Sequence, residues 1–388
     1  MISPYPKDLL VFTAQEYAAR IAACRAAMAE HGLDALVVAS AENLYYLTGF
    51  ASLAWGRTVL ILPATGDAVW MMRQTELSNI RALQDVLWAK AAIGVPDTAD
   101  FGAMLDRAIA DRVGGSAVIG IELGNIPASL RGFVEITPGS GKIRNAGALV
   151  EKLRRVKSPA EIALMHRAGK IVQQSVMDGF DALHAGMLDS DLANVVTESL
   201  VRNGSDRLAQ MPNVASGPRT ARAHITWGHL PIGDGELITV EPAASVENYH
   251  APIYKIMSVG PPGAEADRMF NICKDAFAAG WEAVRPGMTS NEAAAIYENA
   301  IRRTGYGDRM VTRPAYSIGI AFPPGWGEDN VMSLRSGDEN VLEAGMCFHI
   351  CPCLYQDGIG CVAASMPAVL TETGFVSLSG GTIELMVK

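Results

Sequence analysis

The sequence predicts two domains, an α/β domain followed by an α+β domain, and three observations support this fold class. The chain has 388 residues, more than one hydrophobic core usually supports. In the first 150 residues, strand-like apolar runs alternate with helical stretches. After about residue 157 the pattern changes to two long helices and then to a series of strand-like runs. We therefore expect domains at residues 1–152 and 153–388.

The first domain begins with a predicted helix. Thr13 followed by Glu16 matches a capping box, and the helix is expected to end at Gly32, because glycine favours helix C-termini. Short apolar runs that suit buried strands follow, at residues 34–40, 42–50, 57–72 and 116–122. Strands that alternate with helices indicate an α/β unit.

The second domain also opens on a helix signal. Ser158 and Pro159, with Glu161 three residues after the serine, are typical of a helix start, and a second helix is expected from about Ser190. Strand-like runs follow, one of which ends in a glutamate, Glu241, directly before a proline. An acid at the end of a buried apolar strand is costly unless it has a task, since burying an unpaired charge is unfavourable.

Composition narrows the function classes. Hydrophobic residues make up 49% of the chain and charged residues 19%, which is typical of a folded globular protein. The net charge is −9 and the 32 Lys and Arg residues are scattered, so nucleic acid is not an expected partner. The N-terminus lacks a signal-peptide pattern, and no apolar run is long enough to span a membrane. The six cysteines do not resemble a disulfide framework. We expect a soluble, cytoplasmic protein with reduced thiols.

Four sulfur and nitrogen side chains alternate along the run CFHICPCLY. If this run is one strand, Cys347, His349, Cys351 and Cys353 share a face. Same-face neighbours in a strand lie roughly 6.5–7 Å apart, so at most two adjacent residues can share an ion, and a zinc site is disfavoured. Free cysteines often pack as small apolar residues. Alternatively Cys351 is a nucleophile, which requires a low thiol pKa.

Several motifs, taken in this order and spacing, resemble the creatinase/aminopeptidase P/prolidase group. They are KSPAEIALMHRAGKI, ASGPRTARAHITW, GDGELITVEPAAS and LEAGMCFHICP, at residues 157–171, 215–227, 233–245 and 342–352. The resemblance covers nearly the whole chain. It implies a creatinase-type N-terminal domain and a C-terminal catalytic domain with the pita-bread fold.

The best-known members of this group are two-metal peptidases with two aspartates, a histidine and two glutamates as ligands. Here Glu241 matches the first aspartate, Ala251 or Pro252 the second, Tyr316 the histidine, and Cys351 the first glutamate. The position of the second glutamate falls within the segment GIGCVAASMP, which contains no acidic residue. Two hard divalent ions need several carboxylate oxygens. The dinuclear site therefore cannot be assembled, and we expect a metal-independent protein with no cofactor.

Metal-free branches of the group suggest other roles for the remaining residues. Creatinase relies on a histidine in the segment that matches RAHITW, which implies a catalytic role for His224. It also takes a carboxylate-binding arginine and an aromatic residue from its partner subunit, which implies that Arg57 and Trp55 bind a substrate carboxylate across a homodimer. Creatinase's two glutamates fall on Tyr254 and Cys351, so its guanidinium-binding pair is missing.

The ectoine hydrolases are the most similar branch. They resemble this chain in three features: a histidine within an HLTW-like segment, a glutamate at the position of Glu241, and a Tyr-His pattern after that glutamate. The last feature adds His250 as a third catalytic candidate. They differ in keeping acids where this chain has GIGCVAAS.

The expected function is hydrolysis of a C–N bond in a small carboxylate-bearing cyclic amidine or guanidino compound. Catalysis is expected from Glu241, His224 and His250, and substrate binding from Arg57, Trp55, Tyr254, Tyr316 and Cys351. Imidazole titrates near neutrality and can pass a proton in both directions. The alternatives are a creatinase-like amidinohydrolase and a non-enzymatic, metal-free binding protein of the same fold. Each histidine can also be structural, and Glu241 can be a buried acid that only caps a turn.

Overall fold

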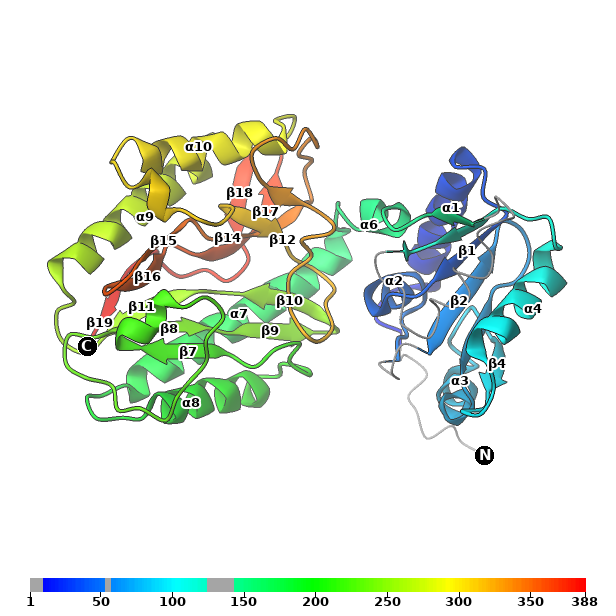
Figure 1. Cartoon of the computed structure of the whole chain (residues 1–388), viewed down its shortest axis with the longest axis horizontal. Coiled ribbons are helices and arrows are strands. Elements are labelled where there is room, and N and C mark those ends of the chain that lie inside the picture. Colours follow the sequence, from blue (N-terminus) through cyan, green and yellow to red (C-terminus); the bar gives the residue numbers. More distant parts are fainter. Residues whose placement is uncertain (1–9, 53–56, 124–142) are drawn as a thin grey trace. The chain divides into compact units, whose positions relative to one another are not determined.

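The structure is a computed structural model that describes residues 10–52, 57–123 and 143–388. The chain divides into two compact units, Met1–Arg154 and Arg155–Lys388. The first is an α/β unit and the second an α+β unit (Figure 1). The fold class predicted from the sequence is confirmed.

The first unit is built on a mixed sheet of six described strands in the order β4-β3-β2-β1-β5-β6. The central strand β1 pairs with β2 in antiparallel and with β5 in parallel orientation. Its described elements are α1 (Ala14–Glu30), β1 (Ala35–Val38), α2 (Ala41–Thr48), β2 (Thr58–Pro63), β3 (Val69–Arg73), α3 (Leu77–Leu83), β4 (Ala91–Val95), α4 (Phe101–Val113), β5 (Ile119–Ile121), β6 (Ile143–Asn145) and α6 (Leu149–Leu153). Apolar residues of α4 pack against one face of this sheet.

One predicted strand of the first unit is wrong. Residues 42–50 were expected to be extended, but most of them form the helix α2. Ser40 caps this helix by accepting a hydrogen bond from the backbone N–H of Asn43 (3.1 Å), and Gly49 ends it with a left-handed φ of 76°. A short apolar run fits a buried helix as well as a strand, so the capping residues decided the outcome.

The second unit consists of two halves, each a pair of helices packed against antiparallel strands. In Figure 1 the strands lie between the helix pair α7 and α8 and the helix pair α9 and α10. The helices are α7 (Pro159–Ala182), α8 (Asp189–Arg202), α9 (Ala264–Ala283) and α10 (Ser290–Arg302). The capping box predicted for Ser158 and Glu161 is present at the start of α7.

The strands of the second unit form several short sheets, in which the pairs are antiparallel except for the parallel pair β11–β19. One has the order β19-β11-β8-β7 and another the order β13-β12-β14-β17-β18, and β9–β10 and β15–β16 form hairpins. The strands are β7 (Asn213–Ser216), β8 (Leu237–Glu241), β9 (Ala243–Val246), β10 (Tyr249–Pro252), β11 (Lys255–Ser258), β12 (Ala315–Ser317), β13 (Ser333–Leu334), β14 (Cys347–Ile350), β15 (Cys353–Gln356), β16 (Gly360–Ala363), β17 (Met366–Thr371), β18 (Gly374–Ser377) and β19 (Met386–Val387).

The run CFHICPCLY is two strands rather than one, which corrects the expectation of a single face. It breaks at Cys351 and Pro352, between β14 and β15. Strand β14 pairs with β12 and β17, whereas β15 pairs with β16 in a different sheet. A proline cannot donate a ladder hydrogen bond, so the chain changes sheets there.

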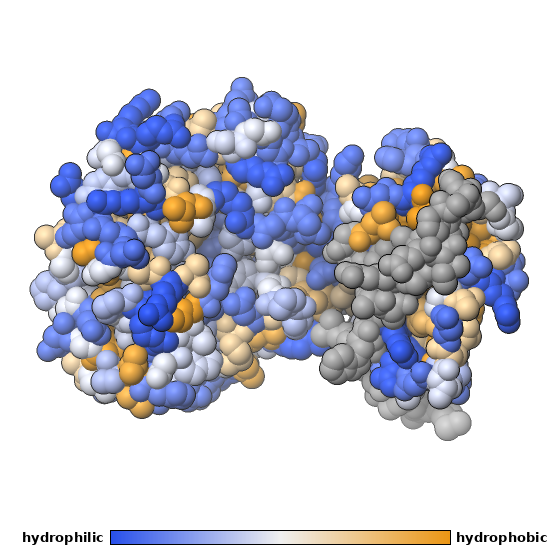
Figure 2. Space-filling view, viewed as in Figure 1, coloured by the Kyte–Doolittle hydropathy of each residue, from blue (hydrophilic) through white to orange (hydrophobic). Residues whose placement is uncertain are grey.

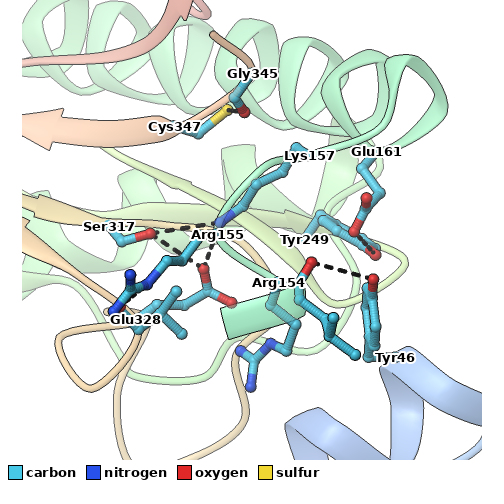
Figure 3. Close-up of polar contacts among 12 residues, drawn as sticks. Tyr46, Arg154, Arg155, Lys157, Glu161, Tyr249, Ser317, Glu328, Gly345 and Cys347 are labelled. Atoms are coloured by element: carbon cyan, nitrogen blue, oxygen red, sulfur yellow. Dashed lines mark hydrogen bonds and ion pairs between the residues drawn. The ribbon is translucent and has the colours of Figure 1, made fainter. Parts of the chain in front are cut away.

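Buried polar contacts hold the strands of the second unit to the segment that starts α7 (Figure 3). Lys157 Nζ donates to Glu328 Oε2 at 2.8 Å and contacts Ser317 Oγ on β12 at 3.4 Å. The hydroxyl of Tyr249 on β10 donates to Glu161 Oε1 at 2.7 Å. These contacts fix β10 and β12, which carry two of the predicted site residues, because breaking a buried ion pair is strongly destabilising.

The visible surface is mainly hydrophilic, with apolar residues scattered over it (Figure 2). No described helix is long and apolar enough to cross a membrane. All six cysteines are free thiols.

Candidate active site

Glu241 closes strand β8 and faces a cavity in the second unit. Strand β7 places Asn213 directly opposite it, and Asn213 Nδ2 donates to Glu241 Oε2 at 2.9 Å. Burial disfavours the charged carboxylate and raises the pKa of Glu241 to about 7, while the Asn213 hydrogen bond offsets part of this shift. A carboxyl group with a pKa near neutrality suits acid–base chemistry.

The cavity has a volume of about 250 Å³ and a mixed polar and aromatic lining. The residues come from strands of both halves of the second unit and from several of the loops between them. They are Gln210, Asn213, Arg222, Ala223, His224, Ile225, Thr239, Glu241, Tyr254, Thr312, Arg313, Tyr316, Gly325, Trp326, Gly327, Asp329, Cys351, Cys353, Tyr355, Cys361 and Ala363. Both charge signs line this space, which suits a small polar molecule rather than an apolar one.

Five of the eight predicted site residues line this one cavity. They are His224, Glu241, Tyr254, Tyr316 and Cys351. His224 lies in a turn, is exposed, and has a φ of 53°, which is uncommon for a residue other than glycine. His229, in the same loop, has a similar φ of 57°, so the backbone conformation alone does not assign a role to His224.

His250 does not line the cavity. It is buried on β10, where its Nδ1 lies 2.9 Å from the carbonyl oxygen of Asn248. Its Nε2 is buried and has no hydrogen-bond partner within the described part of the chain. Burial lowers the pKa of His250 to about 4. The neutral ring has no direct path to a substrate in this cavity.

Arg57 belongs to the first unit, and Trp55 lies outside the described residues. Arg57 is half-buried, and its Nη1 lies 3.4 Å from Asp97 Oδ1. The predicted role of both residues, in which they reach a partner's site, stays a prediction.

Tyr316 belongs to a hydrogen-bond network that extends into the buried core and that the sequence did not predict. Trp326 Nε1 donates to its hydroxyl at 2.9 Å, and that hydroxyl lies 2.8 Å from His349 Nδ1. His349 Nε2 lies 2.6 Å from Ser365 Oγ, which also accepts the backbone N–H of Tyr254. Burial lowers the pKa of His349 to about 3, so this ring is neutral and holds Tyr316 in place. The pairing of β12 with β14 sets Tyr316 opposite His349, and an isolated sequence does not reveal that register.

Three thiols line the cavity and differ in their acidity. Burial raises the pKa of Cys351 well above its usual value. Hydrogen bonds, first from Cys361 and then from Thr312, whose Oγ1 lies 3.0 Å from the sulfur, outweigh burial and lower the pKa of Cys353. A nucleophilic thiolate is therefore disfavoured at Cys351, the cysteine that the sequence singled out.

The cavity contains no acidic cluster at the positions where the group's peptidases bind metal. Among the described residues, no three His, Cys, Asp or Glu side chains are grouped so that they could hold an ion. Of the positions matched above, only Glu241 still carries a carboxylate.

Known protein families match both units. Residues 163–372 match the model of metallopeptidase family M24, and residues 20–156 match the creatinase/prolidase N-terminal domain. The chain belongs to metallopeptidase family M24. This membership confirms the family resemblance seen in the sequence and places the chain in a family of hydrolases.

Individual relatives of this M24 chain carry different names. An ectoine hydrolase of Halomonas elongata is 29% identical over 98% of this chain and 99% of its own length. A probable dipeptidase PepE of Mycobacterium tuberculosis is 27% identical over 97% of this chain and 98% of its own. The crystal structure of a prolidase from Thermococcus sibiricus superposes with a TM-score of 0.87 at 22% identity, over 97% of this chain and 100% of that one. That last likeness shows the fold.

Proposed function

We propose that this protein is a metal-independent hydrolase that cleaves a C–N bond in a small carboxylate-bearing cyclic amidine. The substrate class is that of ectoine, whose ring opening gives an N-acetylated diaminobutyrate. The observation that carries the proposal is Glu241, a carboxyl group at the position of a metal ligand that faces a cavity and whose pKa is raised to about 7. The likeness to an ectoine hydrolase over nearly the whole length supports the same substrate class.

The chemistry requires water to add to the amidine carbon and the ring nitrogen to depart. Glu241 either removes a proton from the water or attacks the amidine carbon itself. In the second case the C–N bond to the departing ring nitrogen breaks and leaves an imidoyl ester of Glu241, which water then hydrolyses to the amide and the free carboxyl group. His224 passes a proton to the departing nitrogen, so the products are an amide and an amine. A cationic amidine that enters beside Glu241 favours its ionised form, because an opposite charge lowers the pKa of a carboxyl group.

The test is turnover of the purified chain on ectoine, creatine and the dipeptide Ala-Pro, with and without a chelator, together with elemental analysis. We expect ring opening of ectoine that persists in chelator. Activity that depends on one or more bound ions per chain contradicts the metal-independent proposal. Turnover of creatine alone supports the creatinase-like alternative, and binding without turnover of all three supports the non-enzymatic one. A single turnover in ¹⁸O-water labels the Glu241 carboxyl group only if Glu241 is the nucleophile.

We also propose that the active species is a homodimer in which Arg57 and Trp55 reach the partner's cavity. The creatinase resemblance supports this arrangement. If it holds, mixing Arg57→Ala chains with His224→Ala chains restores activity, because one of the two sites in a mixed dimer then contains both intact residues. The measurement is turnover of a verified heterodimer. No recovery above the two parent variants places Arg57 outside the site.

A further inference from the structure

The cavity contains an arginine of its own whose role is not explained by the residues predicted from the sequence. Arg313 lies just before β12 and lines the cavity together with Glu241. Its Nη2 donates to Asp329 Oδ1, and its Nε is buried and has no hydrogen-bond partner among the residues that the structure describes. A buried donor without an acceptor is destabilising. The guanidinium group therefore has donor capacity that the described residues do not use.

Neighbouring side chains hold the Arg313 guanidinium in one position. Its Cζ lies 4.8 Å from the centre of the Tyr316 ring, a cation–π geometry. Tyr316 is itself fixed by the hydrogen bonds from Trp326 and to His349. A planar guanidinium held in this way is preorganised to meet a carboxylate, since little rotamer freedom remains to be lost.

The contact with Asp329 indicates what kind of group Arg313 binds. Its carboxylate contacts Arg313 and lines the same cavity, yet its side chain is 56% exposed. An exposed ion pair contributes little to stability, so a ligand's carboxylate can take this place at small cost. The other arginines near the cavity are less suitable. Arg222 is exposed, and Arg219 is bound to the buried Asp189 at 2.7 Å.

We propose that Arg313, rather than Arg57, binds the substrate's carboxylate and that this carboxylate takes the place now held by Asp329. The proposal rests on the proposed function and adds to it a carboxylate site within the same chain as Glu241. A zwitterionic amidine then lies between two groups of opposite charge, its carboxylate on Arg313 and its amidine carbon at Glu241. Such an arrangement selects substrates that carry both charges at the correct separation.

The test compares two ligands that differ only in the carboxylate, ectoine and 2-methyl-1,4,5,6-tetrahydropyrimidine. Their affinities are measured by calorimetry on the full chain with the Glu241→Gln substitution, which prevents turnover. With Arg313→Gln added, we expect ectoine to bind at least about tenfold more weakly and the analogue to bind unchanged, because a charge-assisted bond is lost only for the acid. Asp329→Asn is expected to tighten ectoine alone, since it removes a competing carboxylate.

Equal losses for both ligands in Arg313→Gln, or no loss for either, overturn the proposal. The same selective loss in Arg57→Gln instead assigns the carboxylate to Arg57. If Arg313→Gln does not fold, Arg313→Lys keeps the charge but not the planar fork, and the selective loss is expected there in weaker form. If neither amidine binds the parent chain, the proposed function fails, and the pair Ala-Pro and its C-terminal amide decides on Arg313 by the same criterion.

Discussion

Two glutamates, one in each unit, have similarly raised pKa values and different surroundings: Glu122 is fully buried, whereas Glu241 is half-buried at the wall of a cavity. Glu122 follows β5 in the first unit, and Glu241 ends β8 in the second. Burial raises the pKa of each to about 7. Glu122 accepts hydrogen bonds from the backbone N–H groups of Ala39 and Ser40, both at 2.7 Å, and from Asn43 Nδ2 at 2.6 Å. Among the described residues, Glu241 accepts one hydrogen bond, from Asn213.

The comparison shows that a raised pKa alone does not identify a catalytic acid. The three hydrogen bonds to Glu122 join the end of β5 to the junction between β1 and α2, and the side chain of Glu122 has no exposed surface. Glu241 keeps unused lone pairs that face a cavity of about 250 Å³. The hydrogen-bond partners distinguish a structural carboxyl group from one that can react, since perturbed pKa values also arise in structural networks.

The largest expected difference between the two glutamates is in turnover. Glu241→Gln should lower turnover of the cyclic amidine at least about a hundredfold, the low end for removing a general base. Turnover of Glu122→Gln should stay within about twofold of the wild-type rate, because the Glu122 side chain does not face the cavity. The measurement is kcat for both variants under saturating substrate. A turnover rate of Glu241→Gln close to that of the wild type would contradict a catalytic role for Glu241.

The next difference concerns stability. Burial raises the pKa of Glu241 from 4.5 to about 7, so the folded protein holds a proton there that the unfolded chain releases. The stability linked to this proton is present below pH 4.5 and is lost as the pH rises through about 7. Glutamine carries no charge, so Glu241→Gln should be more stable than the wild type by on the order of 3 kcal/mol at pH 8 and about 1 kcal/mol at pH 5.

Glu122→Gln serves as the matched control for stability. It should share the pH trend, because the pKa of Glu122 is also raised from 4.5 to about 7. It should also carry a constant loss of about 1–3 kcal/mol, since the amide NH₂ cannot accept a hydrogen bond and leaves a buried donor unpaired. Chemical denaturation at pH 5 and pH 8 measures both terms. Equal stabilities of the two variants at pH 5 would remove the distinction drawn from their hydrogen bonds.

The smallest expected effect is on the pH profile. If ionised Glu241 is the active form, kcat/KM rises as the pH increases through about 7. Asn213→Ala removes the hydrogen bond that lowers the pKa of Glu241, so this rise should move to higher pH by up to about one unit. Asn43→Ala, which removes a bond to Glu122 instead, is the control and should leave the profile in place. A profile that is flat between pH 6 and pH 8 contradicts the assignment.

The sequence alone supported the fold class and part of the site. The two-domain pattern, the helix start at Ser158 and the carboxylate at the end of an apolar strand are all local features, so periodicity and capping residues were sufficient to find them. The interpretation of Tyr316 and Cys351 as residues at former metal-ligand positions rests on their places within the motifs and stays a prediction. The helix α2 was missed because a short apolar run has no decisive period.

The sequence by itself therefore determined the fold class and the family, and it predicted Glu241 and His224 as the groups that carry the chemistry. Only the tertiary structure decided which groups meet. It set Asn213 opposite Glu241, brought Tyr316 to His349 and Arg313 to the cavity, and kept His250 out of it. These pairings join residues that are tens of positions apart, so they depend on strand register and on the packing of two helix–sheet halves. Neither is encoded in any local pattern of residues.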